Sequence, residues 1–474
     1  MKQSLTTILF LTFLIGYGQT STKISSKVDD YLEHLIERQG IPGVSIAIVR
    51  NGETLYKNNY GYANIEHQVP ISDKSIFRLY SLTKPMISVG IFQLIEQEKI
   101  NLEDVISTYI QDIPDDWNDI KIKHLLSHSS GLPDMAPIPE FRDLSEKEAK
   151  NKVFAQKIKF DKGSKYDYNQ TGFWLLQKVI ENVTDESLAA FILKNQFDTN
   201  TNSFFSSDSR DIIFNRTTPY FPFEKGTIMI DHSYLQGDYA YAMNGLNITL
   251  NEFIDWDKKL KENKLLNDKS INSMWMKFPY TESNKNFTFG WDNITLNNHE
   301  SYGFSGSLCT AYRIFPDKDL SIIFLSNGLS NWYNIDNIVN HIASLVDDTL
   351  LDINNLAYET ILRMSYENKD MSTPFQQIKK SDILRDNNFE THLNDVGYFW
   401  LYALKNSKKS IDVFKLNVKE HPKSWNVYDS LAEAYETDRN YYMAVHNYKK
   451  SLKLNPDKQY QERIIEKIKL LKEK

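Results

Sequence analysis

Alternating apolar and polar positions predict two antiparallel strand pairs, one near each end of the first 345 residues. Val44, Ile46 and Ile48 alternate with their neighbours, and Asn51-Gly52 follows them as a turn. An Asn-Gly pair between two such segments is a strong hairpin signal. The second pair lies in TAYRIFPDKDLSIIFLSNG, residues 310–328, with Pro-Asp-Lys-Asp as its turn.

Between these hairpins most of the chain has helical spacing or no regular period. Residues 26–40 already show helical spacing and end at Gly40. Strands at both ends with helices in the middle predict one large α+β domain over residues 25–345. In this domain we expect the N- and C-terminal strands to join in a single antiparallel sheet.

The pattern changes after about residue 346. Residues 346–390 are polar and mixed, which predicts a linker with some helix, and residues 391–474 predict an α-helical repeat segment. The segment 425–458 fits the 34-residue tetratricopeptide pattern, and residues 397–422 match it more loosely one period earlier. Seven side chains fall where that repeat packs its two helices: Tyr428, Leu431, Ala432, Tyr435, Ala444, Tyr448 and Pro456.

An unrelated helical hairpin is the alternative interpretation of residues 425–458. Tetratricopeptide repeats normally need three units or a docking partner to bury their faces. Two repeats therefore suggest that this segment rests on the first domain or on another protein.

The N-terminus has the form of a secretory signal peptide over residues 1–18. Lys2 gives a short positive region, residues 8–15 are apolar, and Gly16 and Gly18 give a small-residue end. The apolar stretch is short for a membrane span, so an anchor that stays uncleaved is the less favoured alternative. No later segment is apolar for long enough to span, and we expect an exported protein, periplasmic or secreted.

Composition and charge mainly exclude classes of partner. The chain is 41% hydrophobic and 25% charged, as globular proteins are, and its net charge of −7 gives no electrostatic reason to expect nucleic acid or an anionic membrane. The single cysteine, Cys309, has no second thiol for an internal disulfide. We expect it to be a buried small hydrophobic residue.

Ser81-Leu82-Thr83-Lys84 is the first candidate for chemistry. On a helix, residues three apart share a face, so the Ser81 hydroxyl and the Lys84 amine can meet. Burial lowers the pKa of a lysine, which lets it act as a base towards a hydroxyl. Alone, this spacing is weak evidence for catalysis. Its ordinary interpretation is that the serine caps a helix and that the lysine is solvated.

Three further segments strengthen this candidate: KIKHLLSHSSGLP at 121–133, KGSKYDYNQTGFWLLQKVIENVT at 162–184 and YGFSGSLCTAYRIFPDKDLSIIFLSNG at 302–328. In this order and at these separations, the four segments resemble the class C β-lactamase-like serine hydrolases. That family of penicillin-recognising enzymes includes D-Ala-D-Ala peptidases, esterases and D-amino-acid peptidases. The resemblance implies a β-lactamase/transpeptidase-like fold over residues 25–345.

The resemblance also implies roles for the first two motifs. Ser81 is the residue that becomes acylated, and Lys84 assists the proton transfer. The family's Tyr-x-Asn element falls on Tyr168, Asn169 and Gln170, which makes Tyr168 the candidate acid or base, with an aromatic core residue as the alternative. We expect a nearby lysine to lower the pKa of its phenol. Gln170, in place of the family's asparagine, keeps the amide on a longer arm as a candidate substrate-binding group.

The third motif departs from the family's pattern. Relatives carry Lys or His, one residue, then Gly on an edge strand, whereas this chain has Phe304, Ser305 and Gly306. The three are candidate substrate-binding residues, and loss of the cation weakens the case for β-lactams or peptidoglycan stems as substrates. Gly306 still lets a ligand approach the strand, and the backbone N–H groups of Ser81 and Ser307 form the expected oxyanion hole.

Two other motifs carry less weight. Residues 303–307 look like a nucleophile elbow, but their fifth residue is serine rather than glycine and they precede a strand. His124 and His128 have the i, i+4 spacing of zinc ligands without the glutamate of a metalloprotease between them. We therefore expect no metal and no other cofactor.

Two functions remain open from the sequence. The favoured one is an exported serine hydrolase that acts through an acyl-serine on a small-molecule or peptide ester or amide, as an esterase or D-amino-acid or DD-peptidase-like enzyme rather than a dedicated β-lactamase. The alternative is a catalytically impaired β-lactamase-fold binding protein whose tetratricopeptide repeats mediate protein interaction.

Overall fold

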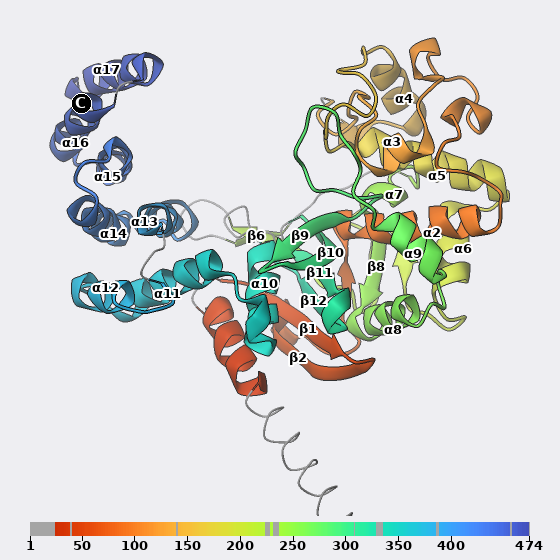
Figure 1. Ribbon diagram of the computed structural model, residues 1–474, viewed down its shortest axis with the longest axis horizontal. Helices are drawn as coiled ribbons and strands as arrows, with labels where there is room; N and C mark the ends of the chain where they lie inside the picture. The colour runs from red at the N-terminus through yellow and green to blue at the C-terminus, as the bar shows by residue number, and fades with distance from the viewer. Residues whose placement is uncertain are drawn as a thin grey trace, which may run out of the picture. The chain divides into compact units, whose positions relative to one another are not determined.

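Seven strands form one antiparallel sheet in the computed structural model, and the sheet joins both ends of the first domain (Figure 1). Strand β1 pairs with β2 on one side and with β12 on the other, where Ile46 lies opposite Phe324. The predicted α+β class and the predicted joining of terminal strands are therefore confirmed. Across the sheet the order is β3 (Val69–Pro70), β2 (Glu53–Asn64), β1 (Gly43–Arg50), β12 (Leu320–Ser326), β11 (Thr310–Phe315), β10 (His299–Gly306) and β9 (Asp292–Leu296).

The first hairpin turns where the sequence predicted. Asn51 and Gly52 have φ angles of 53° and 73°, the left-handed conformations that a tight hairpin turn with an Asn-Gly pair needs. The β11–β12 turn was also predicted, but the β9–β10 hairpin was not. There Asn297 and Asn298 both adopt positive φ, at 44° and 71°, which is a conformation that asparagine tolerates better than most residues.

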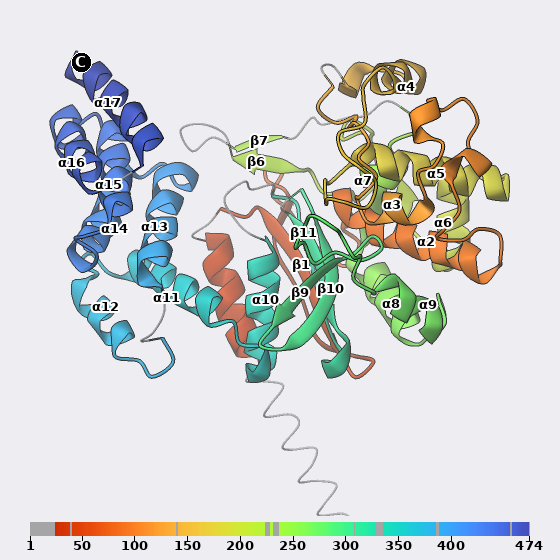
Figure 2. The ribbon, with the colours of Figure 1, turned by 45° about the horizontal axis from the view of Figure 1, so that its top comes forward.

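Each face of the sheet packs against helices (Figure 2). One face is covered by the helix over residues 24–37 and by α10 (Ile335–Val346), whose Val28, Leu32 and Ile342 are fully buried. The other face packs against the large helical region between the hairpins, in a second and larger core. This arrangement puts strand β10 between the two layers, next to the turn that carries Ser81.

The chain between the two predicted hairpins also contains two short sheets that the sequence did not predict, β4-β8-β5 and β6-β7. Strand β4 (Ile76–Arg78) pairs with β8 (Leu246–Thr249) and leads directly to the Ser81 turn. The helices are α2 (Lys84–Glu96), α3 (Ile122–Leu126), α4 (Glu146–Phe154), α5 (Gln170–Thr184), α6 (Leu188–Gln196), α7 (Tyr241–Asn244), α8 (Leu250–Lys261) and α9 (Asp268–Met274). The remaining strands are β5 (Phe204–Phe205), β6 (Tyr220–Pro222) and β7 (Ile228–Ile230).

The chain divides into two compact units. One contains Met229–Leu350 and the residues up to Phe221, and the other contains Leu351–Lys474 and Pro222–Ile228. The signal peptide predicted over residues 1–18 lies outside the part of the chain that the structure describes. That part is 24–37, 40–138, 141–222, 228–230, 237–307, 309–328, 335–384, 388–455 and 457–473.

The second unit is a series of helices in which neighbours along the chain pack together. Six of the side chains predicted to pack the repeat, from Tyr428 to Tyr448, are buried, and Pro456 lies outside the described residues. A repeat segment is consistent with this packing, and its assignment to the tetratricopeptide class stays a prediction. The helices are α11 (Ile353–Glu367), α12 (Ser372–Lys379), α13 (Phe389–Tyr398), α14 (Ser407–Glu420), α15 (Trp425–Thr437), α16 (Tyr441–Leu454) and α17 (Lys458–Lys472).

Residues 346–390, which the sequence predicted to be a linker with some helix, contain α11 and α12. The division between the two units falls directly after Leu350. In the described part of the chain, none of the helices combines the length and the apolar character that crossing a bilayer would require.

Candidate active site

Ser81 lies on a short 3₁₀ turn, η1 (Tyr80–Thr83), which runs directly into α2. Residues i and i+3 eclipse one another in a 3₁₀ turn, so this turn brings Ser81 and Lys84 to the same side as the predicted helix would. Tyr80 has a φ of 51°, in the left-handed region that costs a residue with a Cβ roughly 1 kcal/mol or more. A strained residue therefore directly precedes the candidate nucleophile.

Lys84 is completely buried and makes three polar contacts. Its Nζ lies 3.4 Å from Ser81 Oγ, 3.0 Å from Gln170 Oε1 and 2.9 Å from the carbonyl oxygen of Met243. The last two atoms are carbonyl oxygens, which can only accept hydrogen bonds. A neutral amine has two N–H groups, so both are used by these oxygens and the lone pair is left for the Ser81 hydroxyl.

The surroundings of Lys84 favour this neutral amine. Burial lowers its pKa from 10.5 to about 7, and the negative charge of Asp134 acts in the opposite direction. The other near groups are largely aromatic, with Nζ at 4.9 Å from the centre of the Tyr168 ring and 5.1 Å from that of Phe173. About half of the molecules therefore carry an uncharged Lys84 at pH 7.

Tyr168 completes a chain of hydrogen bonds through Ser81. Its hydroxyl donates to Ser81 Oγ over 2.8 Å. Burial raises the pKa of Tyr168 to about 12, which outweighs the hydrogen bonds with Ser81 and Gln170 that lower it. The expectation that a nearby lysine lowers this pKa is therefore wrong, because the lysine is itself largely dehydrated and half neutral. Tyr168 is a neutral phenol at pH 7 and can donate a proton.

Gln170 connects the lysine and the tyrosine. It is the first residue of α5, and its side chain accepts from Lys84 over 3.0 Å and lies 3.5 Å from the Tyr168 hydroxyl. The preceding Asn169 caps α5 by accepting from the Gly172 N–H over 2.8 Å. The longer arm of Gln170 thus reaches the two proton-transfer groups, in addition to any contact with substrate that the sequence suggested.

Strand β10 runs directly against the Ser81 turn. A Cβ added to Gly306 would lie 2.0 Å from the carbonyl oxygen of Leu79, so only glycine permits this approach. The Thr310 hydroxyl also bonds that carbonyl, over 2.9 Å. Ser307, the predicted oxyanion-hole residue, directly follows Gly306 and has a φ of 44°.

The side chains of Phe304 and Ser305 point to opposite faces of β10, as neighbours on a strand do. Phe304 belongs to the core on the Ser81 side, and its ring centre lies 6.2 Å from that of Tyr168. The Ser305 hydroxyl instead lies 3.4 Å from Asp336 on α10, on the other face. The structure therefore brings Phe304 to the candidate site and turns the Ser305 side chain away from it.

The two histidines with zinc-like spacing have other partners. Nδ1 of His128 accepts from the Asn169 N–H over 3.1 Å, and Nδ1 of His124 accepts from the Lys121 N–H over 3.2 Å. Burial and the nearby Lys84 hold the pKa of His128 well below 6.5. Within the ranges that the structure describes, no three or more His, Cys, Asp or Glu side chains are grouped to hold a metal ion.

Sequence reasoning missed two groups of the site. The Met243 carbonyl is a backbone atom, so no side-chain pattern could have indicated it. Asp134 follows directly on the HSSGLP segment, and its Oδ1 accepts from the Gln170 N–H over 2.9 Å. A carboxylate directly after a family motif is a signal that could have been used.

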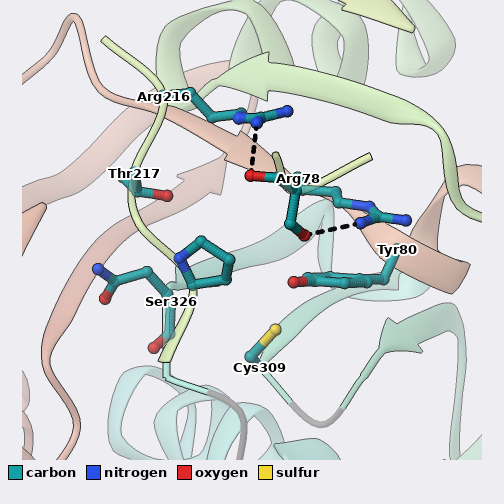
Figure 3. A pocket seen from close by; sticks show the side chains of 9 residues that line it. Arg78, Tyr80, Arg216, Thr217, Cys309 and Ser326 are labelled. Atoms are coloured by element: carbon teal, nitrogen blue, oxygen red, sulfur yellow. Dashed lines mark hydrogen bonds between the residues drawn. The ribbon is translucent and has the colours of Figure 1, made fainter. Parts of the chain in front are cut away.

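A small cavity of about 10 Å³ lies beside Tyr80, with space for about one water molecule (Figure 3). Ser209 joins the two arginines that line it: its carbonyl accepts from Arg216 over 3.0 Å and its hydroxyl from Arg78 over 3.2 Å. Arg78 also donates to the Asn244 carbonyl and side chain. The buried thiol of Cys309 lines the same cavity, in agreement with its predicted burial.

Comparison with known proteins gives the family context. Residues 28–341 match the family described as Beta-lactamase. Protein flp of Staphylococcus aureus (strain NCTC 8325 / PS 47) is 27% identical over 175 residues, which cover 35% of this chain and 35% of that protein. Penicillin-binding protein 4* of Bacillus subtilis (strain 168) is 31% identical over 167 residues, which cover 34% of this chain and 36% of that protein. The matched segment thus spans about a third of these curated relatives.

Two solved structures have the same fold. The octameric penicillin-binding protein homologue from Pyrococcus abyssi superposes with a TM-score of 0.61 at 21% identity and covers 72% of this chain and 81% of its own. EstCE1, a hydrolase with promiscuous acyltransferase activity, superposes with a TM-score of 0.57 at 20% identity. The superposition covers 70% of this chain and 99% of the EstCE1 chain. At these identities the likeness concerns the fold alone.

Proposed function

The chain belongs to the beta-lactamase family, and we propose that it is a serine hydrolase that cleaves an ester or amide through an acyl-enzyme on Ser81. The observation that carries this proposal is the chain of contacts Lys84–Ser81–Tyr168, with distances of 3.4 Å and 2.8 Å. It supplies a base, a nucleophile and an acid within reach of one another.

In the proposed acylation, neutral Lys84 accepts the proton of Ser81 while Oγ bonds to the substrate carbonyl carbon. The N–H groups of Ser81 and Ser307 stabilise the oxyanion of the tetrahedral intermediate. When the intermediate collapses, the bond to the leaving group breaks and Tyr168 donates its proton to that group. The Lys84 ammonium, beside the Tyr168 ring, returns a proton to the phenolate.

Deacylation is proposed to use the same groups in reverse order. Water attacks the acyl carbon, its proton passes to the base, and Ser81 leaves with a proton restored to Oγ. The acid product and the starting enzyme result, so no cofactor is consumed.

The substrates we propose are small esters and amides, as for an esterase or a D-amino-acid or DD-peptidase-like enzyme. Phe304 supports this choice over a dedicated β-lactamase. Its apolar ring stands where relatives carry a cation, so a β-lactam carboxylate would lose its partner and contact a hydrophobic surface instead.

The test uses p-nitrophenyl butyrate and a fluorophosphonate probe. We expect the full-length protein to hydrolyse the ester and to be labelled on Ser81, as mass spectrometry of the labelled peptide would show. Ser81→Ala should lose both activities, whereas Ser107→Ala, at a hydroxyl that donates to the Asn118 carbonyl, should keep them. Equal hydrolysis by wild type and Ser81→Ala would refute the proposal.

We also propose that the protein is exported and that its C-terminal unit contains tetratricopeptide repeats. The burial of Ala432, Tyr435 and Ala444 between α15 and α16 supports the repeat. Mass spectrometry of the mature protein tests export, because a first residue close to position 19 is expected and an intact Met1 would contradict it.

A further inference from the structure

The charge near Ser81 differs from what a carboxylate-binding site needs. Phe304 fills the position of the family's cation and is 8% exposed. Lys84 contributes only part of a positive charge at pH 7, because burial lowers its pKa to about 7. An anionic substrate therefore gains little from either group.

Asp134 adds a negative charge to this region. Its Oδ1 accepts from the N–H groups of Gln170 over 2.9 Å and Ala136 over 3.3 Å. The residues on both sides of Asp134 are tied to Thr171: the Pro133 carbonyl accepts from the Thr171 hydroxyl over 2.8 Å, and the Met135 N–H donates to it over 3.0 Å. The carboxylate is thus held in one place by α5, as a binding group should be.

A single residue, Gln170, connects this carboxylate to the proton-transfer groups. Gln170 bonds Asp134 through its backbone N–H and Lys84 through its side chain. The charge of Asp134 raises the pKa values of both Lys84 and Tyr168, opposing burial in the first case and adding to it in the second. Asp134 is therefore electrostatically coupled to the place where the acyl group forms.

The Asp134 carboxylate forms no direct ion pair in the described part of the chain, and the cation that acts on it is the half-neutral Lys84. Among the residues that the structure describes, no lysine, arginine or histidine forms an ion pair with it, and Oδ2 accepts no hydrogen bond. The contrast is Asp167, next to Tyr168, which pairs with Lys159 over 2.7 Å. A partly exposed carboxylate that forms no ion pair, and whose nearby lysine is only half charged, favours a cationic ligand.

We propose that Asp134 binds a protonated amine of the substrate, so that the enzyme selects esters and amides whose acyl group carries an ammonium near the scissile carbonyl. Amino-acid esters, amino-acid amides and peptides with a free amino group belong to this class. The inference rests on the proposed serine hydrolase function. The aromatic faces of Phe304 and Tyr168 add to it, because aromatic rings attract ammonium groups and not carboxylates.

The experiment compares three methyl esters of similar size at pH 7: β-alanine methyl ester, methyl butyrate and monomethyl succinate. Their acyl groups end in an ammonium, a methyl and a carboxylate. Initial rates give kcat/KM for wild type, Asp134→Asn and the matched control Asp167→Asn. Asparagine at 134 keeps the oxygen that accepts from Gln170 and removes only the charge, and thermal unfolding checks that the variant is folded.

For wild type we expect kcat/KM to fall from the cationic to the neutral to the anionic ester. Asp134→Asn should lower the ratio of cationic to neutral ester by about tenfold, mainly through KM, while Asp167→Asn leaves it within twofold. Because each variant's cationic-to-neutral ratio of kcat/KM is compared with the same ratio for wild type, differences in the intrinsic reactivity of the esters cancel. The midpoint of the pH profile should also move to lower pH in Asp134→Asn, since Asp134 raises the pKa of Lys84.

Two failures are distinguishable. Turnover of all three esters with a cationic-to-neutral ratio that Asp134→Asn leaves within twofold of wild type would overturn the role of Asp134 and keep the hydrolase. Absence of both turnover and Ser81 labelling in wild type would overturn the hydrolase and, with it, this inference.

Discussion

The pH dependence of Ser81 acylation follows from the state of Lys84. With a pKa of about 7, the neutral fraction of Lys84 is about 10% at pH 6, 50% at pH 7 and 90% at pH 8. Only the neutral amine can accept the Ser81 proton. The second-order rate constant of acylation should therefore rise roughly ninefold from pH 6 to pH 8 and then level off.

An ordinary lysine would give a different curve. With its usual pKa of 10.5, about 0.3% of Lys84 would be neutral at pH 8, and the rate would keep rising about tenfold per pH unit up to pH 10. The plateau above pH 8 is thus the signature of burial among Tyr168, Phe173 and the Met243 carbonyl.

Labelling by a fluorophosphonate between pH 5.5 and 9.5, followed by in-gel fluorescence, tests this dependence. Ser81 Oγ attacks phosphorus and fluoride leaves, so the reaction needs the same loss of the Ser81 proton as acylation and has no deacylation step. Tyr168 does not produce the plateau, because its pKa of about 12 keeps the phenol neutral throughout this range. A rate that climbs without levelling off up to pH 9.5, or one that does not change between pH 6 and pH 8, would refute Lys84 as the base.

Three further predictions concern single substitutions. Tyr168→Phe removes the hydrogen bond to Ser81 and the proton donor, so kcat/KM for p-nitrophenyl butyrate should fall about 100-fold with the midpoint near pH 7 unchanged, and a fall of less than threefold would contradict the assignment. Gly306→Ala places a Cβ 2.0 Å from the Leu79 carbonyl oxygen and should lower the free energy of unfolding, measured in urea, by about 2 kcal/mol. Gly172→Ala, whose Cβ has its nearest contact at 3.5 Å, should lower that free energy far less. Equal decreases in the two variants would show that close packing is not the reason for glycine at position 306. Lys84→Met removes a group whose pKa is lower in the folded chain than in the unfolded chain. Between pH 7 and pH 10.5 the unfolded wild type therefore binds more protons than the folded wild type. Lowering the pH in this range favours the unfolded state and destabilises the wild type. The variant should therefore be more stable than wild type at pH 7, with a difference that shrinks by on the order of 2 kcal/mol between pH 7 and pH 9, and a pH-independent difference in urea unfolding would contradict it.

Local patterns predicted the elements whose partners are near in the sequence. The Asn51-Gly52 hairpin and the Ser81–Lys84 contact both depend on spacings of one to three residues, and the structure has both. The β9–β10 hairpin was missed because its turn is Asn-Asn and its strands have polar positions such as Asn293 and Ser301 on their buried side. Alternation alone does not reveal such strands.

The partners of Lys84 could not be predicted, because they come from distant parts of the chain. Gln170 is 86 residues away and Met243 is 159 residues away. The pKa of Tyr168 was predicted in the wrong direction for a related reason. A sequence shows that a lysine is near a motif, but the degree to which both groups are dehydrated depends on the packing of α2, α5 and β10 around them.

The pairing of β1 with β12 has a consequence for biosynthesis. Val44 and Ser326 lie opposite each other but are separated by 282 positions, which a ribosome needs roughly 15 to 60 seconds to translate. During that interval β1 has no partner strand on its β12 edge, and the side chains of Ile46 and Ile48 lack the residues of β12 and α10 that later bury them. The turn that carries Ser81 likewise waits for Gly306 to arrive, so a nascent chain of this protein gains its reactive serine only at the moment its sheet closes.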